Sequence, residues 1–128
     1  MRAALFDAPG QPLIIGEVEA PQPLSTDLLV KVKACGICGT DLHLAAVTDR
    51  SGGMAPLGQG SIMGHEFCGE VVEVGSQAQK SAGGSWHEGD RVCALPYIAC
   101  GQCLDCLAGR GHRCAGAAYN GMGSLAGG

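Results

Sequence analysis

The chain has 128 residues, of which 46% are hydrophobic and 16% charged, and its formal net charge is −4. This length fits one domain, and the hydrophobic content excludes a charged, disordered tail. It has no basic cluster and no apolar run of roughly 20 residues, so neither nucleic acid nor a membrane is a predicted partner. The first residues lack the apolar region and cleavage site of a secretory signal, so a cytoplasmic location is predicted.

Hydrophobic patterning and turn residues predict a mostly β fold. Glycine accounts for 22 residues, and glycine disfavours helices and supplies turns. Gly69 is predicted to mark a β-bulge, because it interrupts an apolar run. The predicted strands cover residues 2–7, 13–19, 27–34, 66–74 and 91–95. Five or six short strands with almost no helix suggest a small barrel.

Between the strands, the sequence predicts one helical turn and several loops. Thr40 is predicted to cap the N-terminus of a helical turn through residues 42–46. Residues 48–61 are glycine-rich and residues 76–88 are polar, so both are predicted as loops. The last 14 residues are mostly Gly and Ala and are predicted to contain no strand.

The chain contains eight cysteines, and four of them are closely spaced. Cys100, Cys103, Cys106 and Cys114 form the pattern C-x2-C-x2-C-x7-C. Four thiolates at such intervals can close a tetrahedral zinc site, with Gly101 allowing the tight backbone. A bacterial iron–sulfur motif would end C-x3-C-P, whereas here the last gap is seven residues and Ala115 follows the final cysteine. Structural zinc is therefore favoured over an iron–sulfur cluster, and a disulfide pair is a minor alternative.

The other four cysteines carry weaker signals. Cys35 and Cys38 form a C-x2-C, which by itself could be a redox pair. Cys68 and Cys93 lie in apolar runs and are predicted to be small, buried hydrophobic residues. His87 and His112 fit no ligand position and are predicted to lie on the surface.

Two short segments together predict an open metal site. One contains Cys38 and the other contains His65, and a thiolate and an imidazole from separate loops are typical ligands of catalytic zinc. Residues 121–126 read G-x-G-x-x-A, like a dinucleotide fingerprint. That interpretation is rejected, because no predicted strand precedes the motif and no helix follows it.

These motifs resemble those of the zinc-dependent alcohol dehydrogenases of the medium-chain dehydrogenase/reductase superfamily. Residues 64–78 match the zinc signature G-H-E-x2-G-x5-G-x2 followed by a small residue, residues 36–43 match G-I-C-x-[ST]-D-x-H, and the four-cysteine spacing matches the family's zinc lobe. The resemblance implies a GroES-like, partly open β-barrel over residues 1–128, with a zinc-binding cysteine-rich lobe at 97–116. It also implies that the domain is incomplete at its C-terminus and that the Rossmann cofactor domain is absent.

The resemblance further implies a role for each matching residue. Cys38 and His65 would ligate the catalytic zinc, with Glu66 an occasional or outer ligand and Asp41 hydrogen-bonded to a ligand. Thr40 and His43 would pass the alcohol proton outward and lie on the cofactor side of the site. A structural zinc would be held by Cys100, Cys103, Cys106 and Cys114.

The implied reaction is NAD- or NADP-linked oxidation of a small alcohol to an aldehyde or ketone through a zinc alkoxide. The full-length enzyme is expected to be a homo-oligomer, and the isolated chain is expected to be inactive. A stand-alone, non-catalytic zinc-binding module is the alternative.

Overall fold

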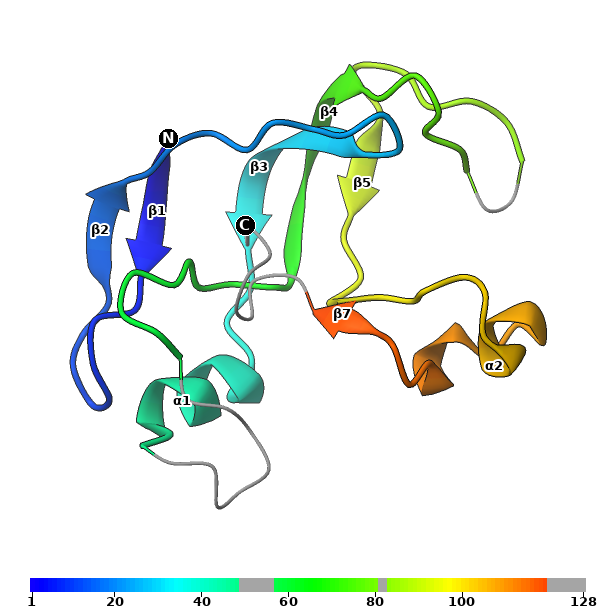
Figure 1. Ribbon diagram of the computed structural model, residues 1–128. Coiled ribbons are helices and arrows are strands. Elements are labelled where there is room, and N and C mark those ends of the chain that lie inside the picture. Colours follow the sequence, from blue (N-terminus) through cyan, green and yellow to red (C-terminus); the bar gives the residue numbers. More distant parts are fainter. Residues whose placement is uncertain (49–56, 81–82, 120–128) are drawn as a thin grey trace.

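The computed structural model describes residues 1–48, 57–80 and 83–119. Within them the chain forms mostly short strands, and the helices are few (Figure 1). The strands are β1 (Arg2–Leu5), β2 (Ile14–Glu17), β3 (Leu28–Cys35), β4 (Phe67–Val74), β5 (Arg91–Cys93), β6 (Tyr97–Ile98) and β7 (Ala118–Tyr119). The helices are α1 (Gly39–Ala46), α2 (Leu104–Leu107) and a 3-10 turn at Gly111–Arg113.

The strands form three separate antiparallel sheets. β1 pairs with β2, β4 lies between β3 and β5, and β6 pairs with β7. In the described part of the chain these sheets do not close into a barrel, which agrees with the predicted partly open, mostly β fold (Figure 1). No helix in the described ranges is long and apolar enough to cross a membrane.

Three predictions about individual elements are wrong. β7 lies within the last 14 residues, where no strand was expected. Its two residues are too few to show a strand pattern, and the strand forms because it pairs with β6. Helix α1 is capped by Cys38 and not by Thr40, since the Cys38 side chain accepts the Thr40 N–H. Gly69 is not a bulge, because the register shifts place the extra residues at Lys33 on β3 and Val72 on β4.

Gly69 has a different role, which is to let β3 and β4 approach closely. A Cβ atom on Gly69 would lie 2.6 Å from Cγ1 of Val30 and would also collide with the carbonyl of Lys31. Val71, two residues further on β4, is the most deeply buried side chain in the described core. The close packing of β3 against β4 therefore requires a residue without a side chain at position 69.

We expect Gly69→Ala to destabilise the domain by roughly 1–3 kcal/mol, because overpacking against backbone forces the strands apart. Gly58→Ala is the matched control, since the nearest atom to its Cβ, Ser61 Oγ, would lie at an ordinary 3.9 Å. Urea unfolding of both variants gives the comparison. Equal midpoints for the two variants would contradict this account.

Strand β1 holds the segment that leads to His65. Phe6 N–H donates to the Ser61 carbonyl at 2.9 Å, and Met63 N–H donates to the Ala4 carbonyl at 2.9 Å. Phe6 and Met63 are both buried in the core. The backbone before His65 is thus fixed beside β1 by these bonds and by an isolated antiparallel bridge between Leu5 and Ile62.

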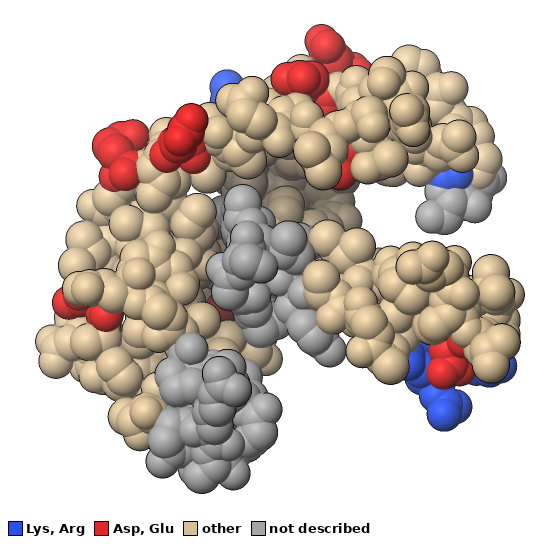
Figure 2. All heavy atoms as spheres, viewed as in Figure 1, with Lys and Arg blue, Asp and Glu red and all other residues tan. Residues whose placement is uncertain are grey.

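The apolar face of the central sheet borders a hollow of about 650 Å³ lined by Val30, Phe67, Trp86 and Val92 among others. Figure 2 shows a deep notch between the strands and the lobe that carries α2. It also shows acidic side chains spread over the strand region and basic side chains gathered on the lobe. One of these, Arg110, pairs with Asp105 at 2.8 Å.

Candidate metal centres

The first candidate site forms at the N-terminus of α1. Thr40 N–H donates to Cys38 Sγ at 3.2 Å, and Cys38 N–H donates to Asp41 Oδ2 at 2.9 Å. These two bonds form a reciprocal capping box, which satisfies backbone donors that a helix start otherwise leaves free. The same bonds hold the thiol of Cys38 and the carboxylate of Asp41 in fixed positions.

His65 completes this group from the other side. Its side chain is almost fully buried, and Nε2 lies 3.1 Å from Cys38 Sγ. A zinc ion bound by both atoms in tetrahedral geometry would separate them by about 3.6 Å, so a small side-chain adjustment admits the ion. Cys38, Asp41 and His65 have ligand atoms that all lie within 4.8 Å of one another.

Asp41 faces the second nitrogen of His65. Asp41 Oδ1 lies 3.1 Å from His65 Nδ1, and both side chains are buried. Within the described residues neither of these two buried atoms has a well-aligned hydrogen-bond partner. Their short separation leaves each facing the other. A carboxylate behind a ligating imidazole is the usual way to fix its tautomer and orientation at a metal. These residues therefore fit a metal at the Nε2 side of His65.

The structure places Glu66 at the edge of this site. Its carboxylate lies against Gly36, where an added Cβ would be 3.1 Å from Oε2, and the side chain is exposed. The Gly36 N–H donates to the Glu66 carbonyl at 2.8 Å. Glu66 is not among the three residues whose ligand atoms converge, and its role as an outer ligand stays a prediction.

Thr40 and His43 are one helical turn apart on α1, which puts them on the same face of the helix. Thr40 is half-buried beside Cys38, whereas His43 is exposed. Thr40 is thus the inner residue of the pair and His43 the outer one.

The second candidate site is the four-cysteine cluster. Cys103 Sγ lies 3.5 Å from Cys106 Sγ, and Cys106 Sγ lies 3.9 Å from Cys100 Sγ. Cys100 N–H donates to the buried Sγ of Cys114 at 3.3 Å. All four sulfurs lie within 4.8 Å of one another, so the structure brings together the set that the spacing predicted. Gly101 has a φ of +75°, which explains the glycine at the first knuckle.

The thiols of this cluster are not equivalent. Backbone N–H groups of Gln102 and then Cys103 lower the pKa of Cys100 to about 6. Desolvation, followed by the neighbouring thiol of Cys103, raises the pKa of Cys106 to about 12. Four thiolates this close repel one another, so a cation is needed to hold all of them deprotonated. The four converging sulfurs therefore fit a structural zinc ion.

The remaining cysteines and histidines lie outside both groups. Cys93 is exposed, so its predicted burial is wrong, and Cys68 is only half-buried. The pKa of Cys35 is raised, mainly because partial burial disfavours its thiolate. His87 and His112 are exposed, as predicted. The G-x-G-x-x-A motif lies outside the described residues.

A β domain with a Cys–His–Asp group and a separate four-cysteine lobe has the ligand sets of a protein with two zinc sites. The sequence profile of the family "Alcohol dehydrogenase GroES-like domain" matches residues 25–128. The chain belongs to this family.

Curated relatives and solved structures agree with this assignment. The chain is 37% identical over 114 residues to the L-threonine 3-dehydrogenase of Rhizobium rhizogenes, which covers 89% of the chain and 31% of that enzyme. Alcohol dehydrogenase TADH from Thermus sp. ATN1 has a TM-score of 0.83 and 35% identity, covering 100% of this chain and 35% of that one. A cobalt- and zinc-bound thermostable alcohol dehydrogenase from Pyrobaculum aerophilum has a TM-score of 0.78 and 30% identity, covering 99% and 36%. The chain thus spans about a third of the length of the proteins it matches.

Proposed function

We propose that this chain is the metal-holding part of a zinc-dependent dehydrogenase that oxidises a small alcohol to an aldehyde or ketone with NAD or NADP. The observation that carries the proposal is the Cys38–His65–Asp41 group, in which Cys38 is half-buried and the other two side chains are buried, together with a separate four-cysteine cluster. The named dehydrogenase activities of the relatives support the same reaction class. We further propose that the enzyme is a cytoplasmic homo-oligomer.

Cys38 and His65 would hold the catalytic zinc, which supplies a Lewis acid that lowers the pKa of a bound hydroxyl. Cys38 presents its sulfur from the helix cap, and His65 presents Nε2 from the backbone beside β1. Asp41 keeps the imidazole oriented from Nδ1. Burial of His65 and Asp41 excludes water from the inner side of the site.

Thr40 and His43 would carry the proton away. The Thr40 hydroxyl would accept the substrate proton while passing its own to the imidazole of His43. The exposed imidazole of His43 can then pass the proton to solvent.

The hydride acceptor would be a nicotinamide, whose redox chemistry belongs to the cofactor. A protein described as a zinc-binding dehydrogenase from Sinorhizobium meliloti 1021 was solved with NADP and has a TM-score of 0.76 and 38% identity, covering 99% of this chain and 33% of that one. Its nicotinamide cofactor supports this part of the proposal.

The remaining residues of the proposal are structural. Cys100, Cys103, Cys106 and Cys114 would hold the second zinc ion and so keep the 97–116 lobe folded. The relatives are about three times longer than this chain, and we propose that a Rossmann domain outside residues 1–128 binds the cofactor.

Metal analysis tests the proposal directly. We expect about two zinc ions per chain in the full-length protein, because two separate ligand groups are present. We also expect NAD(P)-dependent alcohol oxidation by that protein and none by residues 1–128 alone. Iron with visible cluster absorbance would contradict the zinc assignment. Turnover by residues 1–128 would contradict the need for a separate cofactor domain, and a full-length protein with zinc but no dehydrogenase activity would favour a non-catalytic module.

A further inference from the structure

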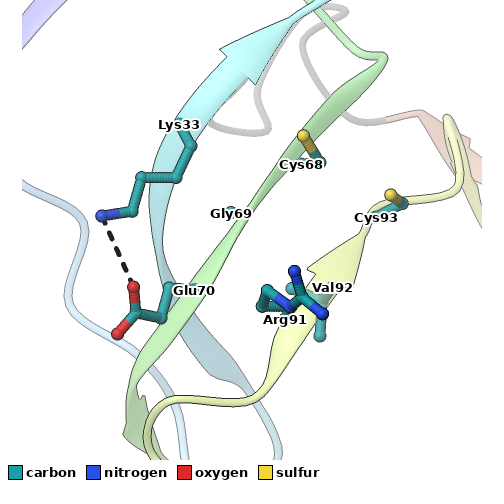
Figure 3. Close-up of a pocket in the computed structure, with 7 residues that line it drawn as sticks. All are labelled: Lys33, Cys68, Gly69, Glu70, Arg91, Val92 and Cys93. Atoms are coloured by element: carbon teal, nitrogen blue, oxygen red, sulfur yellow. Dashed lines mark ion pairs between the residues drawn. The ribbon is translucent and has the colours of Figure 1, made fainter.

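Two cysteines outside both metal clusters lie directly opposite each other on neighbouring strands. Cys68 on β4 and Cys93 on β5 are paired residues in the antiparallel register, and both are free thiols. Figure 3 shows the two side chains next to each other across the strand pair. The proposed zinc chemistry uses neither residue.

The type of pairing decides whether these thiols can be joined. Ala94 N–H donates to the Phe67 carbonyl at 3.0 Å, so the ladder bond flanks the cysteine pair and does not connect it. Cys68 and Cys93 therefore form a non-hydrogen-bonded pair, in which Cα atoms are about 4.5 Å apart and side chains approach most closely. This separation falls within the range of about 4.4–6.8 Å that a disulfide spans.

The pair is also accessible. Cys93 is exposed and Cys68 is half-buried, and both line a hollow of about 410 Å³ (Figure 3). Cys93 also lines the hollow of about 650 Å³, to which Phe67 and Val92 contribute.

The hollow beside the two thiols also carries charge. It is lined by Lys33 and Arg91, together with Glu70. Lys33 pairs with Glu70 at 3.4 Å, while Arg91 makes no ion pair with any residue that the structure describes. A cation beside two accessible thiols favours an anionic thiol reagent over a neutral one.

We propose that Cys68 and Cys93 are a modification site, a cross-strand dithiol that an anionic low-molecular-weight disulfide of the glutathione type oxidises reversibly. The more exposed sulfur, that of Cys93, attacks the reagent, breaks its S–S bond, forms a mixed disulfide and releases one reagent thiol. Cys68 then attacks the Cys93 sulfur and releases the second thiol. Two protein thiols lose two electrons and two protons, and the reagent disulfide gains them as two thiols.

The bond would link two segments that serve different metal sites. β4 begins two residues after His65, and β5 ends seven residues before Cys100. Oxidation would join β4 to β5 by a disulfide bond, and this bond would use no proposed zinc ligand. It is therefore expected to leave the zinc content unchanged.

Mass spectrometry tests the proposal on the zinc-loaded, full-length protein. The protein is treated with oxidised glutathione, its free thiols are alkylated, and it is digested with trypsin and chymotrypsin without reduction. Cleavage after Phe67 and Lys80 isolates Cys68, and cleavage after Arg91 and Tyr97 isolates Cys93. We expect the alkylated forms of both peptides to be lost together and a linked pair lacking two hydrogen atoms to replace them. Dithiothreitol should restore both alkylated peptides.

Matched variants separate this bond from general oxidation. Cys93→Ser should abolish the linked peptide, whereas Cys35→Ser, which removes another cysteine outside the four-cysteine cluster, should leave it intact. Recovery of both peptides fully alkylated with zinc retained would overturn the proposal, and so would linkage of Cys68 to Cys35. The readout needs no dehydrogenase activity, so its failure is distinguishable from failure of the proposed function.

Discussion

Replacing Cys114 with serine is expected to release one zinc ion per chain and to unfold the lobe at 97–116. Cys114 is the buried member of the cluster, and its sulfur accepts the Cys100 N–H at 3.3 Å. Structural zinc sites contribute about 10–16 kcal/mol in finger peptides, which is comparable to the whole stability of a typical domain. Helix α2 has only four residues and no buried side chain, so little else holds this region.

Zinc analysis together with limited proteolysis measures this effect. The lobe of Cys114→Ser should be cleaved at low protease concentrations at which the unaltered protein resists. Cys93→Ser is the matched control, since Cys93 is a free cysteine outside the cluster. A Cys114→Ser protein that keeps two zinc ions and its resistance to protease would refute the structural role.

Asp41→Asn is expected to weaken zinc binding at the Cys38–His65 site by about 10–100-fold, which is the usual cost of removing a carboxylate behind a ligating histidine. The asparagine oxygen can still accept the Cys38 N–H, so the capping box is retained. The carboxylate that faces His65 Nδ1 is lost, and the ring is no longer held in one tautomer.

Competition with a chromogenic chelator measures the affinity, and circular dichroism checks that α1 is intact. The control is Asp7→Asn, because the carboxylate of Asp7 accepts a hydrogen bond from the Gln59 side chain at 2.6 Å and from no other residue that the structure describes. Unchanged zinc affinity in Asp41→Asn, with helix content preserved, would show that Asp41 acts only as a capping residue.

Local spacing predicted that the four cysteines of the lobe converge, and the structure brings their sulfurs together. The intervals between Cys100, Cys103 and Cys106 are short, and a tight turn such as the one at Gly101 brings the sulfurs together. The approach of His65 to Cys38, across 27 positions, was predicted from their residue types and from the motif resemblance, and not from a short spacing. It depends on β1 holding the backbone before His65, a long-range contact that periodicity does not reveal.

The missed features depend on tertiary context. β6 and β7 have two residues each, which is too short for a periodic pattern, and they exist because they pair with each other. Cys93 lies in an apolar run, yet its side chain points to the solvent face because strand residues alternate between faces. Cys38 caps α1 although cysteine is not a preferred capping residue, since its sulfur is the acceptor available at that position.

Because of the capping bond at Cys38, the two candidate metal centres are expected to exchange their ions differently. Its sulfur is already oriented by the Thr40 N–H, so folding of α1 supplies the ordering that metal binding would otherwise require. We therefore expect an ion bound at this centre to be removable and replaceable, for instance by cobalt, while α1 keeps its shape. The lobe has one similar bond, from the Cys100 N–H to Cys114 Sγ, but its helix α2 has only four residues and no buried side chain, so its ion should leave only as the lobe opens. Mild chelation followed by cobalt should thus yield a hybrid protein, with cobalt beside His65 and zinc among the four cysteines.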